Sequence, residues 1–331
     1  MQVKSLRVLL AAGLLATAWQ TGASAQDKIM LRFSAASPPS DFLSKSMEVF
    51  KTEIDKAAPN QFDVRLHPGS TLFRQGTEVP AIQRGNLEMS YMQTFEVSQQ
   101  VPELGTLNRA YLFRDYAHMM AVMRGPIGEE VAKKVLDKMQ IKILAVTYLG
   151  TRQVNLRVVR DVKGPADLAG IKLRMPASPE WLLLGQTLGV SPTPMAMAET
   201  YTALQTGAVD GQENPLTIGF AAKFHEVTKQ VVLTSHLVQP VFTALGKQAW
   251  DKMNDEQKKK VTAAAQAAAK YNDDARLEDE KQVAEKYKAA GLTISAIDLA
   301  AFRANADKVY AASDLAKNWD KDLEKRILAT K

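Results

Sequence analysis

The sequence predicts an α/β protein of two lobes, and three observations carry that prediction. Short runs with alternating apolar residues, typical of strands, are interleaved with longer runs of helical spacing. The 331 residues are enough for two domains of ordinary size. No low-complexity linker separates the halves, so we expect strands that cross between the lobes to join them. Lobes joined in this way move as hinged bodies around a cleft, which suits ligand capture.

The first 25 residues (1–25) have the order of a secretory signal peptide. Lys4 and Arg7 precede an apolar stretch at residues 8–19, and Ala23-Ser24-Ala25 is a small-residue cleavage site. The apolar stretch is short for a membrane span, although an uncleaved anchor or a buried helix is the alternative. We therefore expect an exported protein that begins near Gln26 and resides in the periplasm.

Composition argues against several classes of protein. The formal net charge of +6 falls to +4 when Lys4 and Arg7 are removed, which is too little for nucleic-acid binding and mildly favourable for anionic ligands. The chain has no cysteine, so it has no disulfide, thiolate metal ligand or cysteine nucleophile. Its four histidines show no metal-binding spacing. We expect no metal, no cofactor and no nucleic-acid partner, and we expect a monomer.

The N-terminal elements follow from hydrophobic periodicity. Alternation predicts strands at Ile29–Phe33 and Phe62–Leu66, and the spacing of apolar residues predicts a helix at Phe42–Lys56 between them. Part of another helix is expected at Pro80–Arg84, followed by a strand at Leu87–Met92.

The middle of the chain carries the expected core of the sheet. Ile141–Leu149 is a continuous apolar run, which indicates a central buried strand and favours parallel sheet elements. Alternation resumes at Val154–Val158 and again at Ile171–Met175.

The C-terminal third predicts a long helix. No Pro or Gly interrupts Asn254–Ala290, Asn254 with Gln257 forms a capping pair, and Gly291 is a plausible stop. The pattern leaves open one long helix or two nearly continuous ones. A solvated bundle helix fits the same pattern.

Arg174 is the first candidate binding residue. It alternates with the apolar positions of the strand Ile171–Met175, and Pro176 ends that strand because proline cannot donate to the ladder. Ligands of open α/β sheets lie at strand ends, and a guanidinium there can grip a carboxylate through two parallel hydrogen bonds. A structural or interdomain salt bridge is the alternative.

Two further polar residues follow predicted elements. Asn214 lies in the Asp-Gly-Gln-Glu-Asn-Pro turn at residues 210–215, where Pro215 restricts it to extended geometry, so its amide can donate to an anion. An asparagine that only satisfies turn backbone is the alternative. Arg152 follows the apolar run Ile141–Leu149 and is a second candidate cation, or else a surface salt bridge.

Motifs of enzymes are missing. The sequence has no Gly-x-Ser-x-Gly nucleophile elbow, no Gly-x-Gly-x-x-Gly loop and no Walker A loop. These absences make an enzyme a less favoured interpretation of the sequence. A periplasmic enzyme acting on a carboxylate stays open as an alternative, with Glu213 as the nearest candidate acid or base.

Several consecutive blocks resemble one family. Gly170–Pro176, Pro192–Ala196 and Leu204–Pro215, together with Gly150-Thr151-Arg152-Gln153, resemble the solute-binding proteins of tripartite ATP-independent periplasmic (TRAP) transporters, of the dicarboxylate-binding-protein type. The resemblance covers essentially the whole mature chain. It implies a periplasmic-binding-protein-like fold whose two lobes close on a ligand cleft, with a long C-terminal helix bridging them. It also implies a receptor and not an enzyme.

The resemblance implies roles for individual residues. Arg174 corresponds to the principal carboxylate clamp, Asn214 to its companion and Arg152 to a further polar contact. Gln93 falls where relatives carry a substrate-selective polar residue, and Met197 where the family's sialic-acid binders carry an aromatic residue. Glu213 is structural in the family pattern.

Two regions make the ligand harder to name. Trp181 is a rim residue or interior packing beside Leu182–Leu184. Phe73-Arg74-Gln75-Gly76 departs from the family's Gly- and acid-rich continuation, which argues against sialic acid and leaves the contacts of the first lobe undetermined. A sugar acid, a hydroxy acid, a keto acid or a dicarboxylate all fit one carboxylate clamp.

We therefore expect an extracytoplasmic receptor that delivers a small organic carboxylate to a permease of one small and one large integral membrane subunit. We expect one lobe at residues 26–149 plus about 240–278, and the other at 150–239 plus about 279–331. An ABC-type periplasmic binding protein is the alternative closest in kind.

Overall fold

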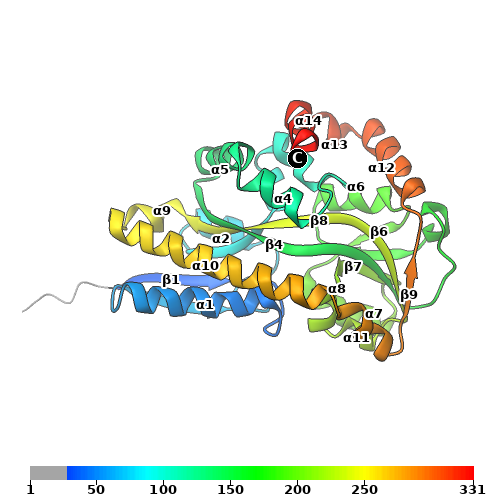
Figure 1. Cartoon of the computed structure of the whole chain (residues 1–331), viewed down its shortest axis with the longest axis horizontal. Coiled ribbons are helices and arrows are strands. Elements are labelled where there is room, and N and C mark those ends of the chain that lie inside the picture. Colours follow the sequence, from blue (N-terminus) through cyan, green and yellow to red (C-terminus); the bar gives the residue numbers. More distant parts are fainter. Residues whose placement is uncertain (1–27) are drawn as a thin grey trace, which may run out of the picture.

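The computed structural model describes residues 28–331, so the expected signal peptide lies outside the described residues. One mixed sheet runs through this part of the chain, with helices on both faces (Figure 1). The order of its strands is β2-β1-β3-β8-β4-β7-β5-β6, and β9 pairs with β8. The strands are β1 (Ile29–Ser34), β2 (Phe62–His67), β3 (Met89–Gln93), β4 (Ile141–Leu156), β5 (Lys172–Met175), β6 (Ser191–Pro194), β7 (Gly211–Pro215), β8 (Gln230–Gly246) and β9 (Thr293–Ala296).

The helices alternate with these strands along most of the chain. They are α1 (Phe42–Ala57), α2 (Glu78–Gln83), α3 (Thr94–Ser98), α4 (Tyr116–Met123), α5 (Pro126–Met139), α6 (Pro179–Thr187), α7 (Thr200–Thr206), α8 (Leu216–Ala221), α9 (Lys247–Asp251), α10 (Asp255–Glu280), α11 (Val283–Ala289), α12 (Ala300–Ala312), α13 (Asp314–Lys317) and α14 (Lys321–Ala329). The strands and helices expected in the N-terminal half are confirmed, with boundaries shifted by a few residues.

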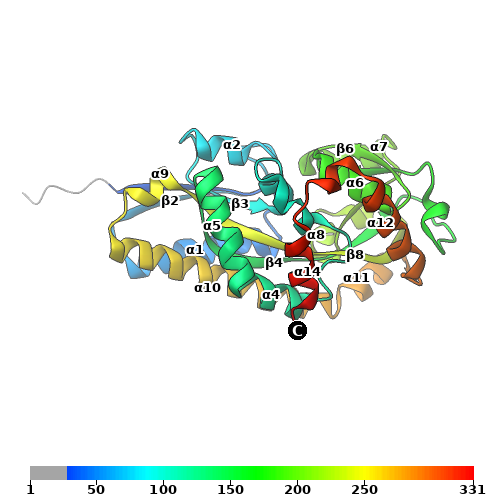
Figure 2. The same cartoon turned by 90° about the horizontal axis from the view of Figure 1, so that it is seen from above.

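Two long antiparallel strands join the lobes. The first half of β4 pairs with the second half of β8 in one lobe, and β3 extends that ladder. The second half of β4 pairs with β7, while the first half of β8 pairs with β9. The two lobes lie side by side with β4 and β8 running between them, which confirms the two-lobed fold (Figure 2).

Gly150 lies where β4 passes from one lobe to the other. The register with β8 shifts between Tyr148 and Gly150, and Gly150 has φ +127°. A Cβ added there would lie 2.4 Å from the Cβ of Pro215, so both the backbone conformation and the space require glycine. The strands expected at 141–149 and 154–158 form one element, β4, because its pairing with β8 continues on both sides of this irregularity.

The long helix has the expected caps and a break. Asn254 and Gln257 exchange side-chain to backbone hydrogen bonds of 3.0 and 2.9 Å at its start. The helix ends at Glu280, and α11 continues the chain until Gly291, which has φ +87°. Ala264, Ala265 and Ala268 are buried, and their small side chains allow α10 to pack closely on α1. The two helices lie side by side over the length of α1 (Figure 1). It also contacts α8 of the other lobe, so it bridges the two lobes.

Two expectations about local structure are wrong. The parallel pairing inferred from the apolar run is absent around β4, whose neighbours are antiparallel. The run is apolar because α10 covers one face of β4 and α4 with α5 cover the other. Residues 211–215 form strand β7 instead of a turn, since the chain there pairs with both β4 and β5.

The expected lobe boundaries stay a prediction. One observation bears on the end of the chain: Leu323 and Ile327 of α14 lie in an apolar cluster with Leu104 and Met119. Arg326 of α14 also forms a 2.9 Å ion pair with Glu130 of α5. The last helix thus packs against the N-terminal half of the chain.

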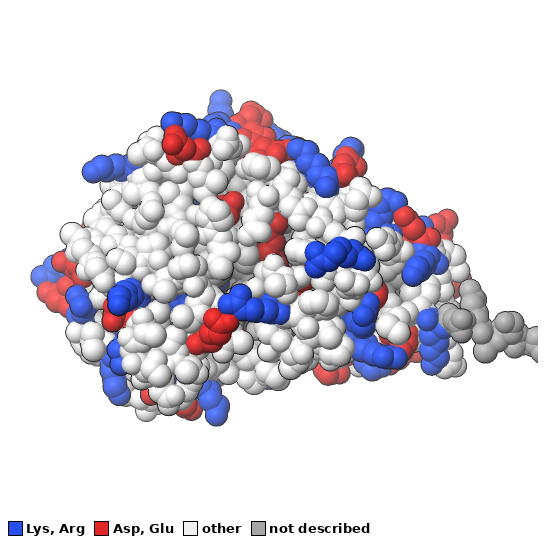
Figure 3. Space-filling view, turned by 180° about the vertical axis from the view of Figure 1, so that it is seen from behind, with Lys and Arg blue, Asp and Glu red and all other residues white. Residues whose placement is uncertain are grey.

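Charge is dispersed over the face opposite to that of Figure 1. Basic and acidic side chains are mixed around its edge, and several of both kinds also lie near its middle (Figure 3). Among residues 28–331, no helix is both long and apolar enough to cross a membrane. The same residues contain no group of three His, Asp or Glu side chains placed to hold a metal ion.

Candidate carboxylate-binding cleft

A small cavity lies between the lobes, at the ends of β3 and β5. Its volume is about 40 Å³. This is room for a few water molecules, because one water needs roughly 10–15 Å³ on this measure. It is lined by Ala36, Ser37, Leu43, Gln75, Tyr91, Gln93, Leu149, Arg152, Arg174, Pro176, Met197, Asn214, Ile218 and Val241. Five of the six residues predicted from the sequence are among them, and Trp181 is not.

Arg174 is a buried cation without an internal counter-ion. It lies one residue before the end of β5, and its side chain is 1 % exposed. Its Nε donates to the carbonyl of Met195 at 2.9 Å, and Nη2 donates to Oε1 of Gln75 at 2.9 Å. In the described part of the chain no ion pair involves Arg174, and these two bonds leave three of its five N–H donors for a ligand.

The burial of Arg174 has an electrostatic cost. Burial lowers the pKa of its guanidinium to about 9, with attraction from Glu213 opposing the shift and repulsion from Arg152 adding to it. The side chain is therefore still cationic at neutral pH. A charge this far from water is destabilised unless it is paired and hydrogen-bonded. An anionic ligand in the cavity would supply that partner.

Arg152 is in the opposite situation, because Glu213 neutralises it. Nε and Nη2 of Arg152 both bond the Glu213 carboxylate, and both side chains are at most 2 % exposed. The guanidinium also stacks over Trp181, 4.5 Å from the ring centroid. Although burial acts to raise it, the pKa of Glu213 is lowered by Arg152 and by hydrogen bonds from His236 and Arg152. Arg152 thus positions its neighbours and adds no net charge.

His236 completes this buried group as a neutral ring. Burial lowers the pKa of His236, opposed by the hydrogen bond and the charge of Glu213. Its Nε2 lies 3.1 Å from Oε2 of Glu213, and its Nδ1 lies 2.8 Å from the hydroxyl of Thr234. A neutral imidazole donates to the carboxylate and accepts from the hydroxyl.

A hydrogen-bonded relay leads from Arg152 to Gln93. Nη1 of Arg152 donates to Oε1 of Gln239 at 2.8 Å, and Nε2 of Gln239 donates to Oε1 of Gln93 at 3.0 Å. Nη2 of Arg152 donates to Oδ1 of Asn214 at 3.0 Å. Because arginine only donates, the orientation of each of these amides is fixed.

Asn214 and Met197 lie together beside the two arginines. Nδ2 of Asn214 donates to Oε1 of Gln212 at 2.6 Å and lies 3.9 Å from the sulfur of Met197. Both residues are nearly buried and line the cavity. Trp181 is 1 % exposed, and the guanidinium of Arg152 lies over its ring. Trp181 therefore belongs to the interior packing, which is the second of the two roles considered for it.

Sequence reasoning missed Gln75 as a site residue. Its Oε1 accepts from Arg174 and also from the backbone N–H of Met197 at 2.8 Å, so a residue from the segment between β2 and α2 contacts the far lobe. The adjacent Arg74 forms a 2.7 Å ion pair with Glu199, also across the lobes. The only feature of the sequence that pointed to this segment was the departure of Phe73–Gly76 from the family pattern. Nothing in these residues indicated that Gln75 would contact Arg174.

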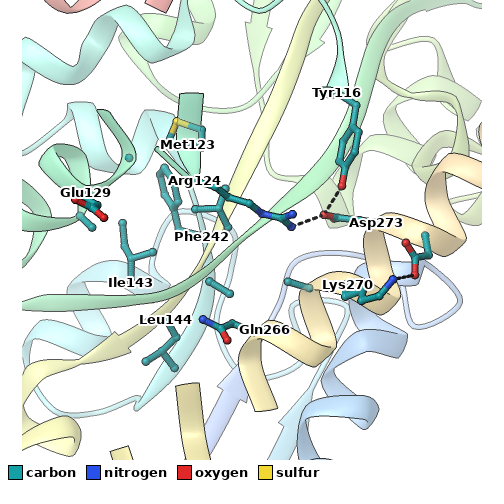
Figure 4. Close-up of a pocket in the computed structure, with 16 residues that line it drawn as sticks. Tyr116, Met123, Arg124, Glu129, Ile143, Leu144, Phe242, Gln266, Lys270 and Asp273 are labelled. Carbon is teal, nitrogen blue, oxygen red and sulfur yellow. Dashed lines mark hydrogen bonds and ion pairs between the residues drawn. The ribbon is translucent and has the colours of Figure 1, made fainter. Parts of the chain in front are cut away.

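A larger groove lies outside the cleft. It has a volume of about 720 Å³ and is lined by residues of α4, α5, β4 and α10 (Figure 4). Several of its charged groups are already paired, since Asp273 accepts from Tyr116 at 3.2 Å and forms an ion pair with Arg124 at 3.5 Å. Lys270 pairs with Asp274 on the same helix. We therefore take the smaller cavity, where the buried Arg174 lacks a counter-ion, as the candidate site.

The geometry defines a class of protein: two hinged lobes enclosing a cavity for a small anion. The sequence profile of the family described as bacterial extracellular solute-binding protein, family 7 (DctP) matches residues 33–316. This match spans most of the chain, and the chain belongs to this family of TRAP solute-binding proteins.

Three solved structures are similar over nearly the whole chain. A TRAP solute-binding protein from Roseobacter denitrificans, with bound 3-deoxy-D-manno-oct-2-ulosonic acid, is 40 % identical with a TM-score of 0.88, covering 92 % of this chain and 100 % of that one. A Bordetella relative, whose bound density was assigned as pantoate, is 30 % identical with a TM-score of 0.85 and coverage of 92 % and 100 %. A Polaromonas relative bound to D-erythronate is 30 % identical with a TM-score of 0.86 and coverage of 92 % and 99 %.

Proposed function

We propose that this chain is the periplasmic receptor of a TRAP transporter and binds one small monocarboxylate between its lobes. The buried Arg174 carries this proposal. Its three remaining donors can take a carboxylate through two parallel bonds, and the anion offsets the cost of its burial. The acids bound to the three relatives support the same ligand class.

The charges around the cavity favour a single carboxylate over a dicarboxylate. Arg174 is one uncompensated cation, Arg152 is neutralised by Glu213, and His236 is neutral. A second carboxylate would find no free cation among the described residues that line the cavity. Since an unpaired buried charge is costly, the proposed ligand carries a net charge of −1.

Delivery and location are further parts of the proposal. The family membership and the signal-like order of residues 1–25 support export to the periplasm. A permease of one small and one large membrane subunit would receive the ligand there, as in TRAP systems. Transport into liposomes that hold both subunits, with and without this protein, tests the delivery step. Uptake that does not depend on the protein would reject it.

We also propose that the chain is not an enzyme. Glu213 is the acidic group closest to the arginines, but its carboxylate is 0 % exposed and bonded to both Arg152 and His236. A carboxylate held by both groups is not free to act as an acid or a base on a ligand bound by Arg174. Turnover of a bound acid would overturn this part of the proposal.

A thermal-shift panel tests the ligand class. A ligand that binds only the folded state raises the melting temperature. We expect one or more monocarboxylates to raise it, and expect the uncharged amide of the same acid to leave it unchanged. An equal effect of acid and amide, or no effect of any acid, would contradict the proposal.

A further inference from the structure

Gln239 lies on β8 at the point where this strand passes between the lobes. It is opposite Gly150 of β4 in the register of the sheet, and it is 0 % exposed. Gln239 is not among the residues that line the cavity, whereas its two hydrogen-bond partners, Arg152 and Gln93, both line it. A buried amide outside the cavity thus connects two side chains that a bound acid would meet.

The register of the sheet brings these three side chains together. Gln93 of β3 is opposite Val241 of β8. Arg152 of β4 is opposite Leu237 of β8. Gln239 is two residues from each of these two positions, and residues two apart in a strand point to the same face. Diagonal neighbours on adjacent strands lie within reach of long side chains, so the contacts follow from the pairing of β3, β8 and β4.

The ion pair of Arg152 with Glu213 anchors this group. Both side chains are at most 2 % exposed, and Nε and Nη2 of Arg152 bond the carboxylate. Nη1 of Arg152 is directed to Gln239 instead. Because the two charges of the pair cancel, the anchor imposes an orientation on Gln239 and adds no net charge to the cavity.

Arg152 determines which end of each amide points where. A guanidinium has only N–H donors, so the oxygen of Gln239 must face Nη1 of Arg152, at 2.8 Å. The Nε2 group of Gln239 therefore points the other way and donates to Oε1 of Gln93 at 3.0 Å. With its oxygen engaged, Gln93 has its own Nε2 hydrogens left to offer to the cavity.

We propose that Gln239 is a positioning residue of the cleft, which fixes the amide of Gln93 so that the first lobe presents an N–H donor, and not a carbonyl oxygen, to the bound acid. An organic acid is rich in oxygen acceptors, so the donor end of the amide is the end that suits it. This inference rests on the proposed function and adds to it a residue that does not touch the ligand.

Gln239→Glu reverses the direction of hydrogen bonding with little change of shape. At pH 8 the new carboxylate is ionised beside Arg152 and still accepts from it. It can only accept from Gln93 as well, so Gln93 must turn its Nε2 toward residue 239 and its oxygen toward the cavity.

Nuclear magnetic resonance detects this turn in the protein without any added acid. The side-chain NH₂ signals of Gln93, identified by their loss in Gln93→Leu, should shift in Gln239→Glu and exchange more slowly with water, because they now donate to a carboxylate. Unchanged shifts and exchange in folded Gln239→Glu would overturn the inference, whether or not an acid binds.

A double-mutant cycle tests the effect on binding. D-Erythronate, pantoate and 3-deoxy-D-manno-oct-2-ulosonic acid, the acids of the three relatives, are titrated calorimetrically into the wild type, Gln239→Glu, Gln93→Leu and the double variant. The added charge weakens binding of anions in both backgrounds, but the turned amide matters only where Gln93 is present. We expect Gln239→Glu to lose about three- to tenfold more affinity in the presence of Gln93 than in the Gln93→Leu background.

The outcomes separate this inference from the proposed function. Equal losses in the two backgrounds would overturn the role of Gln239 and leave the proposed function standing. Failure of all three acids to bind the wild type would count against the proposed function, and the resonance experiment would still decide the role of Gln239.

Two further variants complete the test. Gln186→Glu adds the same charge at an exposed position of α6 and should show no coupling with Gln93. Gln239→Met has a similar length but neither hydrogen bond, so it leaves the amide of Gln93 free to turn. Its loss of affinity should also shrink in the Gln93→Leu background, and this result decides the inference if Gln239→Glu fails to fold.

Discussion

Arg152 and Arg174 have the same side chain but opposite electrostatic surroundings. Arg152 is bound by a carboxylate, two amides and an aromatic ring, whereas Arg174 is bound by one carbonyl and one amide oxygen. The sequence predicts both arginines at strand ends, but it does not indicate which of the two has a carboxylate partner. Glu213 is 61 residues from Arg152 in the chain, and only the pairing of β4 with β7 brings the two together.

Gln75 offers a test at the scale of one residue. Its two hydrogen bonds reach from one lobe to Arg174 and Met197 of the other, so they form only when the lobes are closed. Gln75→Ala should lose about 2 kcal/mol of the stability of the closed complex, or roughly 30-fold in affinity, mainly through faster dissociation. Stopped-flow dissociation of the tightest acid of the panel measures this. Gln99→Ala, at an exposed position, is the control, and unchanged dissociation from the Gln75 variant would contradict the role.

At the scale of elements, short-range signals predicted the structure well. Alternation, capping residues and stops located β1, β2, α1 and the start of α10. Pairing partners were not predictable in the same way, because an apolar run reports burial and not the direction of its neighbours. The apolar run therefore suggests a parallel centre that the sheet does not have. The polar, Gly- and Pro-containing segment 211–215 predicts a turn, and only its pairing with β4 and β5 makes it a strand.

Helices α2 and α3 each contain one buried carboxyl group, Glu78 and Glu96. Glu78 accepts from the backbone N–H of Gly76, and Glu96 accepts from the backbone N–H of Gln93. Burial raises the pKa of Glu78 to about 7, and burial together with repulsion from Glu78 raises the pKa of Glu96 to about 8. The Glu96 carboxyl thus holds the backbone of Gln93, which lines the cavity.

These raised values predict a pH dependence of stability. The folded state keeps protons that the unfolded chain loses near pH 4.5, so this contribution is full below that pH and is lost as the pH rises through about 7 to 8. Glu96→Gln keeps an acceptor oxygen for Gln93 but removes one charge. Melting temperatures from pH 5 to 8.5 should therefore fall less steeply in this variant than in the wild type. Glu129→Gln, at an exposed position, is the control, and parallel curves for the wild type and Glu96→Gln would contradict the account.

At the scale of the whole molecule, three crossings define the hinge: β4, β8 and the helix α10. Arg276 of α10 joins the lobes near this hinge, since its Nη2 bonds Asp41 at the start of α1 at 2.8 Å and its Nη1 bonds Thr217 of α8 at 2.5 Å. All three side chains are buried. The absence of a linker predicted a hinged molecule from the sequence, but this contact depends on three segments far apart in the chain and could not be predicted.

The hinge predicts a change of shape on binding. A cavity of about 40 Å³ that is closed by contacts between the lobes admits a ligand only when the lobes separate. Small-angle scattering should show a smaller radius of gyration on addition of the tightest acid of the panel. Its uncharged amide at the same concentration should have no effect. A profile that stays the same at saturating acid would favour a preformed pocket.

The central claim is that Arg174 holds the carboxylate of the ligand inside the closed molecule. Removing one partner of a buried, hydrogen-bonded ion pair typically costs about 3–5 kcal/mol, or roughly a hundred- to a few thousand-fold in affinity. Arg174→Lys keeps the charge but loses the planar fork, so it should also bind substantially more weakly. Both variants should fold, because the buried guanidinium has no carboxylate partner among the described residues and contributes two hydrogen bonds.

Calorimetric titration of the tightest acid of the panel into the wild type, Arg174→Ala, Arg174→Lys and the exposed control Arg160→Ala measures this directly. We expect wild-type affinity in Arg160→Ala and the predicted losses in both Arg174 variants, with circular dichroism showing an intact fold. Near-wild-type affinity in folded Arg174→Ala would contradict the account. Unfolding of that variant without ligand would instead mark Arg174 as a residue that holds the lobes together.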